Sequence, residues 1–256
     1  MQNQIAKRDT EAIIHMVSKI KYIFKNRNVA AFDIVDFHSH ILPKADHGSE
    51  SVDVSLWQLK SASKHGIRRI IATPHFYPHR DSVDTFLKRR NSAFDKLQSS
   101  IGDLDIEIKL GAEVLLCQGI ERLPELEKLL LTGTNILLAE LPNADMLQDI
   151  CKSVKNIIDS GIRIVLAHPE RYEISIVENL LDVGVKLQLN ASAVTQRRWS
   201  SDIQRWLKTG AVVAIGSDIH KKNKKAYKAF CRATAYTDIE HIKNTSDELW
   251  DSSEKR

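Results

Sequence analysis

Residues 34–40 read Ile34-Val35-Asp36-Phe37-His38-Ser39-His40, an apolar run that leads directly into a pair of histidines. Far along the chain, the apolar run 211–215 leads in the same way into Asp218-Ile219-His220. In a strand, residues i and i+2 point to the same side, so each pattern places two ligating side chains on one face. Imidazole and carboxylate ligands together suit Zn, Mn or Fe. The two patterns predict a metal site at which strand ends from both parts of the chain meet.

Apolar runs of strand length recur between these two motifs, separated by stretches long enough for a helix. The runs cover 34–37, 69–73, 106–110, 135–139, 162–167, 185–189 and 211–215, and apolar residues recur at helical spacing in 52–65, 83–97 and 145–160. Alternating strands and helices with buried strands indicate a parallel sheet or barrel. The sequence therefore predicts an α/β fold in which about seven β/α units nearly close a barrel.

Most of these runs end in a potential metal ligand. The residues are His38 with His40, His75, Glu113, Glu140, His168, and Asp218 with His220, while the remaining run ends in Asn190. A single histidine or glutamate at a strand end is more often structural, but parallel strands gather their carboxyl ends on one rim. Asp46 adds a further carboxylate, although an aspartate before His47-Gly48 is also a common turn residue. Clustered acids repel one another unless cations neutralise them, which favours a site for two or three ions.

Composition fits one large domain with a buried core: 256 residues, 43% hydrophobic, with a formal net charge of +4. This mild charge gives no reason to expect a nucleic-acid partner. The three cysteines lie far apart and fit a reducing cytoplasm. We find no apolar run long enough to span a membrane and no signal peptide, so we expect a cytoplasmic protein. The chain also lacks a Cys-x5-Arg phosphatase motif, a Walker loop and a Gly-x-Gly-x-x-Gly motif.

Both ends of the chain differ from the predicted domain, which we place at 33–243. Residues 1–32 carry an apolar stripe at helical spacing, interleaved with lysines and an arginine, and predict an amphipathic basic helix. We expect this helix to pack on the domain or on a second subunit, with association to a membrane surface as the alternative. Residues 244–256 are polar, and we expect them to form a tail that frays.

The order of these motifs resembles that of the polymerase and histidinol phosphatase (PHP) superfamily. Three phrases are similar to the manganese-dependent protein-tyrosine phosphatases of bacterial capsule and exopolysaccharide loci. They are Asp36-Phe37-His38-Ser39-His40-Ile41-Leu42-Pro43, Ile71-Ala72-Thr73-Pro74-His75 and Ala167-His168-Pro169-Glu170-Arg171-Tyr172. The resemblance runs from about residue 34 to about residue 227 and implies a distorted seven-stranded (β/α) barrel of the PHP type.

The resemblance also implies a centre of three divalent ions, which we expect to be Mn2+, with Fe, Zn or Co as alternatives. The first ion would be held by His38, His40, Glu113 and Asp218. Glu113 would bridge to a second ion held by Glu140 and His168, and the third would be held by Asp46, His75 and His220. Divalent ions can activate water for attack on phosphorus without a covalent nucleophile. We therefore place Glu113 and Asp218 at the catalytic centre.

Two cations outside the ligand set are candidates for holding phosphate. Arg171 follows His168 and can make bidentate bonds to phosphate oxygens, or it can form a surface ion pair with Glu170 or Glu173. Lys225 stands where the family tends to place a second arginine, and supplies charge without a planar fork, or it belongs to a solvated lysine cluster. The loop 76–80 after His75 could frame an aromatic phosphoester, as could a rim loop of another specificity. Neither His47 nor His79 is assigned as a general acid by the sequence.

Three functions remain open from the sequence. The favoured one is a tyrosine phosphatase that acts on the tyrosine-rich tail of a bacterial autokinase regulating polysaccharide synthesis, an assignment that rests on the resemblance. The second keeps the metal centre and changes the substrate to a small phosphomonoester such as histidinol phosphate, or to a nucleic-acid end. The third is a non-catalytic regulatory module stabilised by metal, against which the complete ligand set argues. A homo-oligomer is possible in each case.

Overall fold

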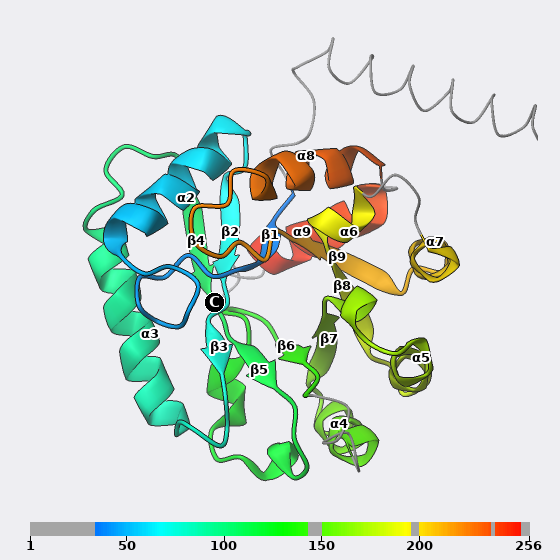
Figure 1. The fold of residues 1–256 in the computed structure, drawn as a ribbon. Coiled ribbons are helices and arrows are strands. Elements are labelled where there is room, and N and C mark those ends of the chain that lie inside the picture. The colour runs from blue at the N-terminus through cyan, green and yellow to red at the C-terminus, as the bar shows by residue number, and fades with distance from the viewer. Residues whose placement is uncertain (1–33, 143–149, 196–199, 237–238, 252–256) are drawn as a thin grey trace, which may run out of the picture.

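The computed structural model describes residues 34–142, 150–195, 200–236 and 239–251 (Figure 1). The predicted amphipathic helix in 1–32 lies outside these described residues. The strands occupy the interior, and the helices α2 to α5, α7 and α8 surround them (Figure 1). All strand pairs within the described ranges are parallel. The prediction of an α/β fold with parallel strands is confirmed.

The strands form two sheets. The first contains β1 (Asp36–Ser39), β2 (Arg69–Ala72) and β4 (Glu107–Leu110), in the order β1-β2-β4. The second runs in the order β3-β5-β6-β7-β8-β9. Its members are β3 (His75–Phe76), β5 (Glu113–Leu115), β6 (Ile136–Glu140), β7 (Arg163–Ala167), β8 (Lys186–Asn190) and β9 (Val212–Gly216).

Two interruptions separate these sheets, and the short strands β3 and β5 that follow them were not expected from the apolar runs. Thr73-Pro74 divides β2 from β3, and Gly111-Ala112 divides β4 from β5. A proline has no amide hydrogen for a ladder, and a Cβ at Gly111 would lie 2.4 Å from a Leu131 methyl carbon. Hydrogen bonds continue across the interruptions, from Gly111 N to Ala72 O (2.9 Å) and from Glu113 N to Pro74 O (3.1 Å). Each interruption delivers a candidate ligand, His75 or Glu113, as the first residue of the next strand.

The last strand returns to the first. Asp218 N donates to His38 O (2.8 Å), and His40 N donates to Ile219 O (3.3 Å). Ser39 and Ile219 also form an isolated parallel bridge. These few contacts, in place of a regular ladder, close the path of hydrogen bonds from β9 to β1. They bring the two motifs at opposite ends of the sequence side by side, as predicted.

The helices begin where the sequence supplies capping side chains. Ser51, Ser82 and Ser200 accept hydrogen bonds from Val54 N, Thr85 N and Ile203 N, at the starts of α2, α3 and α7. The helices are α2 (Val52–Lys64), α3 (Val83–Gln98), α4 (Ile150–Asp159), α5 (Ile174–Asp182), α6 (Ala191–Val194), α7 (Ser201–Lys208), α8 (Ala226–Tyr236) and α9 (Ile239–Asp251). In the described ranges, none of them has both the length and the apolar character needed to cross a membrane.

The carboxyl-terminal helix α9 differs from the frayed tail that we expected from residue 244 onward. Leu249 and Trp250 are buried, with 1% and 7% of their surface exposed, and pack in a cluster with Val35, Phe37 and other strand residues. Lys109 Nζ donates to the carbonyl of Leu249 (2.7 Å), near the end of the helix. We expected a frayed tail because the segment is polar on average, but its two large apolar residues, Leu249 and Trp250, lie on one helix face. Residues 244–251 are therefore part of the packed domain.

Candidate metal centre

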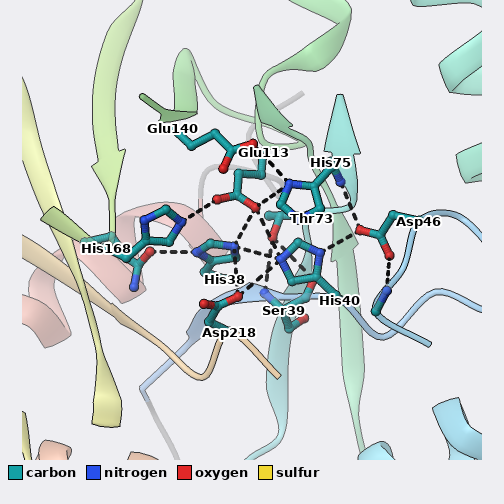
Figure 2. A network of polar contacts seen from close by, with 12 residues as sticks. His38, Ser39, His40, Asp46, Thr73, His75, Glu113, Glu140, His168 and Asp218 are labelled. Atoms are coloured by element: carbon teal, nitrogen blue, oxygen red, sulfur yellow. Dashed lines mark hydrogen bonds and ion pairs between the residues drawn. The ribbon is translucent and has the colours of Figure 1, made fainter. Parts of the chain in front are cut away.

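The carboxyl ends of the strands carry a buried cluster of histidines and carboxylates (Figure 2). It contains all nine residues that the sequence predicts as metal ligands, and contacts of 2.6–3.7 Å connect them to one another. His38, His40 and Glu113 are almost completely buried, whereas His220 lies nearer the surface. The strand order thus turns residues that are scattered over the sequence into one site.

Glu113 lies at the middle of the cluster (Figure 2). Its Oε2 atom is 3.1 Å from His38 Nε2, 3.3 Å from His40 Nε2 and 3.0 Å from His75 Nδ1. Oε1 is 2.7 Å from His168 Nε2. Within the described part of the chain, Oε2 is buried without a hydrogen bond of good geometry. A carboxylate oxygen faced by three imidazole nitrogens fits a bridging metal ligand.

A second set of donors combines the opening and closing motifs. His38 Nε2 and His40 Nε2 lie 3.0 Å apart, and Asp218 Oδ1 is 3.7 Å and 3.4 Å from them. Two imidazole nitrogens and a carboxylate that converge in this way form a donor set suited to a divalent transition metal. The donor atoms of these three residues all lie within 4.8 Å of one another.

Three further donor groups overlap with this one. Their atoms also lie within 4.8 Å of one another, in the sets His38-Glu113-His168, His75-Glu113-Glu140 and His40-His75-His220. In the last set, Nε2 of His220 is a buried atom without a hydrogen-bond partner among the described residues. The groups resemble the predicted partition, except that His38, His40 and His75 each belong to two of them and Asp46 belongs to none. Unpartnered donors and shared ligands are the arrangement expected of a multinuclear site.

Asp46 sits at the edge of the cluster and contacts the far side of His40. Its Oδ2 atom is 2.6 Å from His40 Nδ1 and accepts a hydrogen bond from His75 N (3.0 Å). Its Oδ1 atom accepts from Gly48 N (2.8 Å). A carboxylate on the second nitrogen of a ligating histidine fixes the ring's orientation and tautomer. In this structure Asp46 holds such an orienting position, and its role as a direct ligand stays a prediction.

A chain of side-chain amides behind the cluster was missed by the sequence analysis. Gln188 Oε1 is 2.8 Å from His38 Nδ1, and Gln188 Nε2 donates to Asn190 Oδ1 (3.1 Å). Asn190 Nδ2 in turn donates to Asp218 Oδ2 (2.9 Å). The chain thus joins two candidate ligands of one donor set and restricts the orientation of both. A glutamine inside the apolar run 185–189 was the available signal.

Tyr172 supports His168 in a similar way. Its hydroxyl oxygen is 3.1 Å from His168 Nδ1 and accepts a hydrogen bond from Leu141 N (3.1 Å). His168 thereby has a polar group at each ring nitrogen, with Glu113 on the cluster side. Tyr172 is a further residue of the site that the sequence analysis did not assign.

Unusual backbone at two strand ends turns candidate ligands toward the cluster. His168 and Asp218 have φ angles of 36° and 47°, in the left-handed region that costs energy for residues other than glycine. Close backbone packing requires glycine nearby, because a Cβ at Gly48 would lie 2.2 Å from His40 Cβ. A Cβ at Gly216 would lie 2.5 Å from His38 Cβ. The ligand positions are therefore held by strained and closely packed backbone.

Charges in the cluster depend strongly on one another. Burial opposes ionisation of Glu113 and Asp218, but the neighbouring His38 and other histidines hold the pKa of both carboxyls well below their usual range. Burial would lower the pKa of His40, yet hydrogen bonds to Asp218, Asp46 and Glu113 raise it well above its usual value. The carboxylates are therefore stabilised by positive charge beside them, which divalent cations would supply.

The two cations predicted to hold phosphate have different surroundings. Arg171, in a short 3-10 helix (Pro169–Arg171), donates from Nη2 to Asp218 Oδ2 (2.5 Å), and its side chain is 53% exposed. This contact replaces the surface ion pair with Glu170 or Glu173 that we considered. Lys225 is exposed, and within the described ranges it makes no ion pair with a carboxylate of the cluster. The structure therefore brings Arg171 to the cluster and leaves Lys225 on the surface.

Comparison with known proteins yields relatives over most of the chain. Tyrosine-protein phosphatase CpsB of Streptococcus pneumoniae is 27% identical over 207 residues, which cover 73% of this chain and 83% of the relative. The putative tyrosine-protein phosphatase CapC of Staphylococcus aureus is 30% identical over 66% of this chain and 65% of its own length. Tyrosine-protein phosphatase YwqE of Bacillus subtilis is 26% identical over 73% of this chain and 77% of its own length.

Structural comparison agrees on the fold. A chain from the crystal structures of YwqE from Bacillus subtilis and CpsB from Streptococcus pneumoniae, described as metal-dependent tyrosine phosphatases, superposes with a TM-score of 0.68. The match covers 84% of this chain and 92% of that one at 20% identity. The family described as capsular polysaccharide synthesis, CpsB/CapC, matches residues 34–250. The chain belongs to this CpsB/CapC family, as its strand-end motifs led us to expect.

Proposed function

We propose that this protein is a metal-dependent protein-tyrosine phosphatase. The observation that carries the proposal is the convergence of nine histidine, aspartate and glutamate side chains on one rim, with Arg171 beside them. Among the residues that the structure describes, no cysteine belongs to this cluster, and its histidines and carboxylates fit chemistry by bound cations and activated water. Relatives named tyrosine-protein phosphatases supply the substrate class.

The donor set fits divalent cations, and we propose three Mn2+ ions, with Fe, Zn or Co as alternatives. His38, His40 and Asp218 would hold one ion, Glu113 would bridge it to a second at Glu140 and His168, and His75 and His220 would hold a third near Asp46. When bound, such ions supply Lewis-acid polarisation of the phosphoester and a nucleophile from water near neutral pH.

The chain's own residues position the substrate around this centre. Arg171 can exchange its contact with Asp218 for non-bridging oxygens of the phosphate, since more than half of its side chain is exposed. A guanidinium in that position stabilises the charge that develops during transfer. Gln188, Asn190 and Tyr172 keep His38, Asp218 and His168 in fixed orientations. Burial of most ligands excludes bulk water from the base of the site.

We further propose that the physiological substrate is a phosphotyrosine-bearing bacterial autokinase of polysaccharide synthesis, encountered in the cytoplasm. The family's description as capsular polysaccharide synthesis proteins and the names of the relatives support this context. Homo-oligomer formation stays a prediction that size measurement in solution would test.

The decisive test is hydrolysis of a phosphotyrosyl peptide by the purified full chain with and without metal. We expect activity with added Mn2+, loss of activity with EDTA, and recovery when excess Mn2+ is returned. Histidinol phosphate and a DNA 3′-phosphate serve as comparison substrates in the same assay. Absence of phosphotyrosine hydrolysis under all metal conditions would contradict the proposal, and faster turnover of either comparison substrate would move the assignment to that substrate class.

A further inference from the structure

The loop that follows β3 forms one side of the cluster and has no part in the proposed metal binding. Tyr77 of this loop is half-buried, and its ring lies nearly parallel to the imidazole of His75. The two ring planes differ by 15°, and their centroids are 5.3 Å apart. Because His75 is a candidate ligand, Tyr77 is directly beside the place where a phosphate would bind.

Arg80 folds back over this tyrosine. Its guanidinium carbon is 4.9 Å from the centroid of the Tyr77 ring, within the range of a cation–π contact. A turn produces this geometry, because Arg80 N and Asp81 N both donate to the carbonyl of Tyr77, at 2.9 Å and 3.1 Å. Arg80 is exposed, and within the described ranges it forms no ion pair with a carboxylate. Tyr77 covers one planar face of the guanidinium. The guanidinium has a second planar face, on which another aromatic ring can stack.

A partly buried connection through Arg89 holds this loop against the metal-binding cluster. Arg89 of α3 donates from Nη2 to Asp81 Oδ2 (2.7 Å) and from Nε to the carbonyl of Ala45 (2.8 Å). Ala45 immediately precedes Asp46, which contacts His40 and the backbone of His75. The loop and the cluster are therefore fixed relative to each other by one guanidinium. Such fixed geometry lowers the entropic cost of binding a ligand across both.

From this arrangement we infer that Tyr77 and Arg80 form a subsite for the aromatic ring of an aryl phosphoester. The inference rests on the proposed phosphotyrosine activity and adds the residues that would recognise the ring. In phosphotyrosine the bridging oxygen is attached directly to the ring, so a phosphate bound at the cluster leaves the ring at its rim. An aliphatic phosphoester offers no π face there and gains nothing from the pair.

Equilibrium binding of two phosphonates to the Mn2+-loaded full chain separates the contribution of the ring to affinity from that of the phosphonate group. Phenylphosphonate and methylphosphonate carry the same charged group and are not hydrolysed, so leaving-group reactivity does not enter. By titration calorimetry, we expect the wild-type protein to bind phenylphosphonate more tightly. Arg80→Ala and Tyr77→Leu should each reduce this preference about two- to fivefold while leaving methylphosphonate affinity unchanged. Tyr77→Phe keeps the ring and should keep the preference.

Arg68→Ala is the matched control, because Arg68 is also an exposed arginine but lies beside the amino end of β2, near Asp105. It should leave both affinities unchanged. Three results would overturn the inference: no ring preference in the wild type, an unchanged preference in both Arg80→Ala and Tyr77→Leu, or an equal loss of both phosphonates in these variants. Peptide hydrolysis, measured in parallel, distinguishes failure of the proposed phosphatase activity from failure of the ring subsite. A ring preference without hydrolysis would contradict only the activity, and hydrolysis without a ring preference would contradict only the subsite.

Discussion

The two ends of the strands have opposite chemistry although the same short strands connect them. At the carboxyl ends, histidines and carboxylates are packed within hydrogen-bond distance of one another. At the other end, Leu249 and Trp250 of α9 close the ring of strands and pack on Val35, Phe37 and their neighbours. In β1, Phe37 contributes to the apolar cluster while His38, the next residue, contributes to the polar one.

This difference shows how the protein keeps so many polar groups buried. Removing charged groups from water is costly unless they are paired or bind cations, and strained backbone at His168 and Asp218 adds to that cost. The apolar cluster supplies favourable burial in the same strands. We therefore expect changes at the rim to abolish metal binding and catalysis with little effect on folding. Changes at the base should lower the stability of the fold with little effect on catalysis.

The largest effect is expected from Asp218→Asn, which removes a charge at the rim and keeps the shape of the side chain. Loss of a ligand should exceed the effect of changing an outer-shell partner, so activity should fall by more than about 100-fold. Phosphatase assays, with metal content measured by mass spectrometry, test this prediction. Circular dichroism should show an unchanged fold. Wild-type turnover in this variant would refute the role assigned to Asp218.

Leu249→Ala tests the base, because this side chain is 1% exposed within the apolar cluster. We expect the free energy of unfolding to fall by about 2–5 kcal/mol as a cavity forms. Urea denaturation measures the change, and kcat below the transition should stay close to that of the wild type. Ile174→Ala is the control, since Ile174 is 46% exposed and should cost less than about 1 kcal/mol. If the two variants are equally stable, α9 does not close the base as described.

Arg171→Ala removes the cation that contacts Asp218 at the rim. If the guanidinium stabilises charge in the transition state, kcat should fall by about 10²-fold. Arg171→Lys should recover only part of this, because an ammonium cannot make two parallel bonds to phosphate. Steady-state kinetics with a phosphotyrosyl peptide provide the measurement, with Glu173→Ala as a neighbouring control. A rise confined to KM would instead assign Arg171 to binding of the ground state.

Gln188→Leu tests whether the amide chain behind the cluster tunes the metal site. The variant removes the group 2.8 Å from His38 Nδ1 and should lower metal affinity by about 10–100-fold. Gln188→Glu keeps an acceptor at that place and should lose less. Competition with a fluorescent chelator gives the affinity directly. Equal affinities in wild type and Gln188→Leu would limit the glutamine to packing.

The smallest effect is expected from Lys225→Ala, because this exposed lysine makes no ion pair with the cluster carboxylates in the described ranges. We expect KM to rise about two- to threefold with kcat unchanged, in line with the small energies of exposed charges. Lys222→Ala, in the same run of lysines, is the comparison. An equal effect of both substitutions would mean that the lysines act together as a charged surface and that Lys225 has no special position.

Local sequence patterns predicted most of the strands and the residues that the structure brings together as candidate ligands. Alternation along a strand is a property of neighbouring residues, so His38-x-His40 and Asp218-x-His220 could be recognised before any contact was known. The same patterns did not predict β3 and β5, the short strands that begin after Thr73-Pro74 and Gly111-Ala112. They also failed at α9, whose buried face depends on strands far away in the sequence.

The sequence by itself determined which residues are available as ligands, the parallel α/β fold, and the family to which the chain belongs. Only the tertiary structure decided that His38, His40 and His75 are each shared between donor groups. It also decided that Asp46 contacts the far side of His40, and that Gln188 and Asn190 connect His38 to Asp218. The reason is physical. The sequence gives a residue's identity, and local strand geometry gives the face on which its side chain lies. Its partners depend on the twist, interruption and closure of strands that meet from distant parts of the chain.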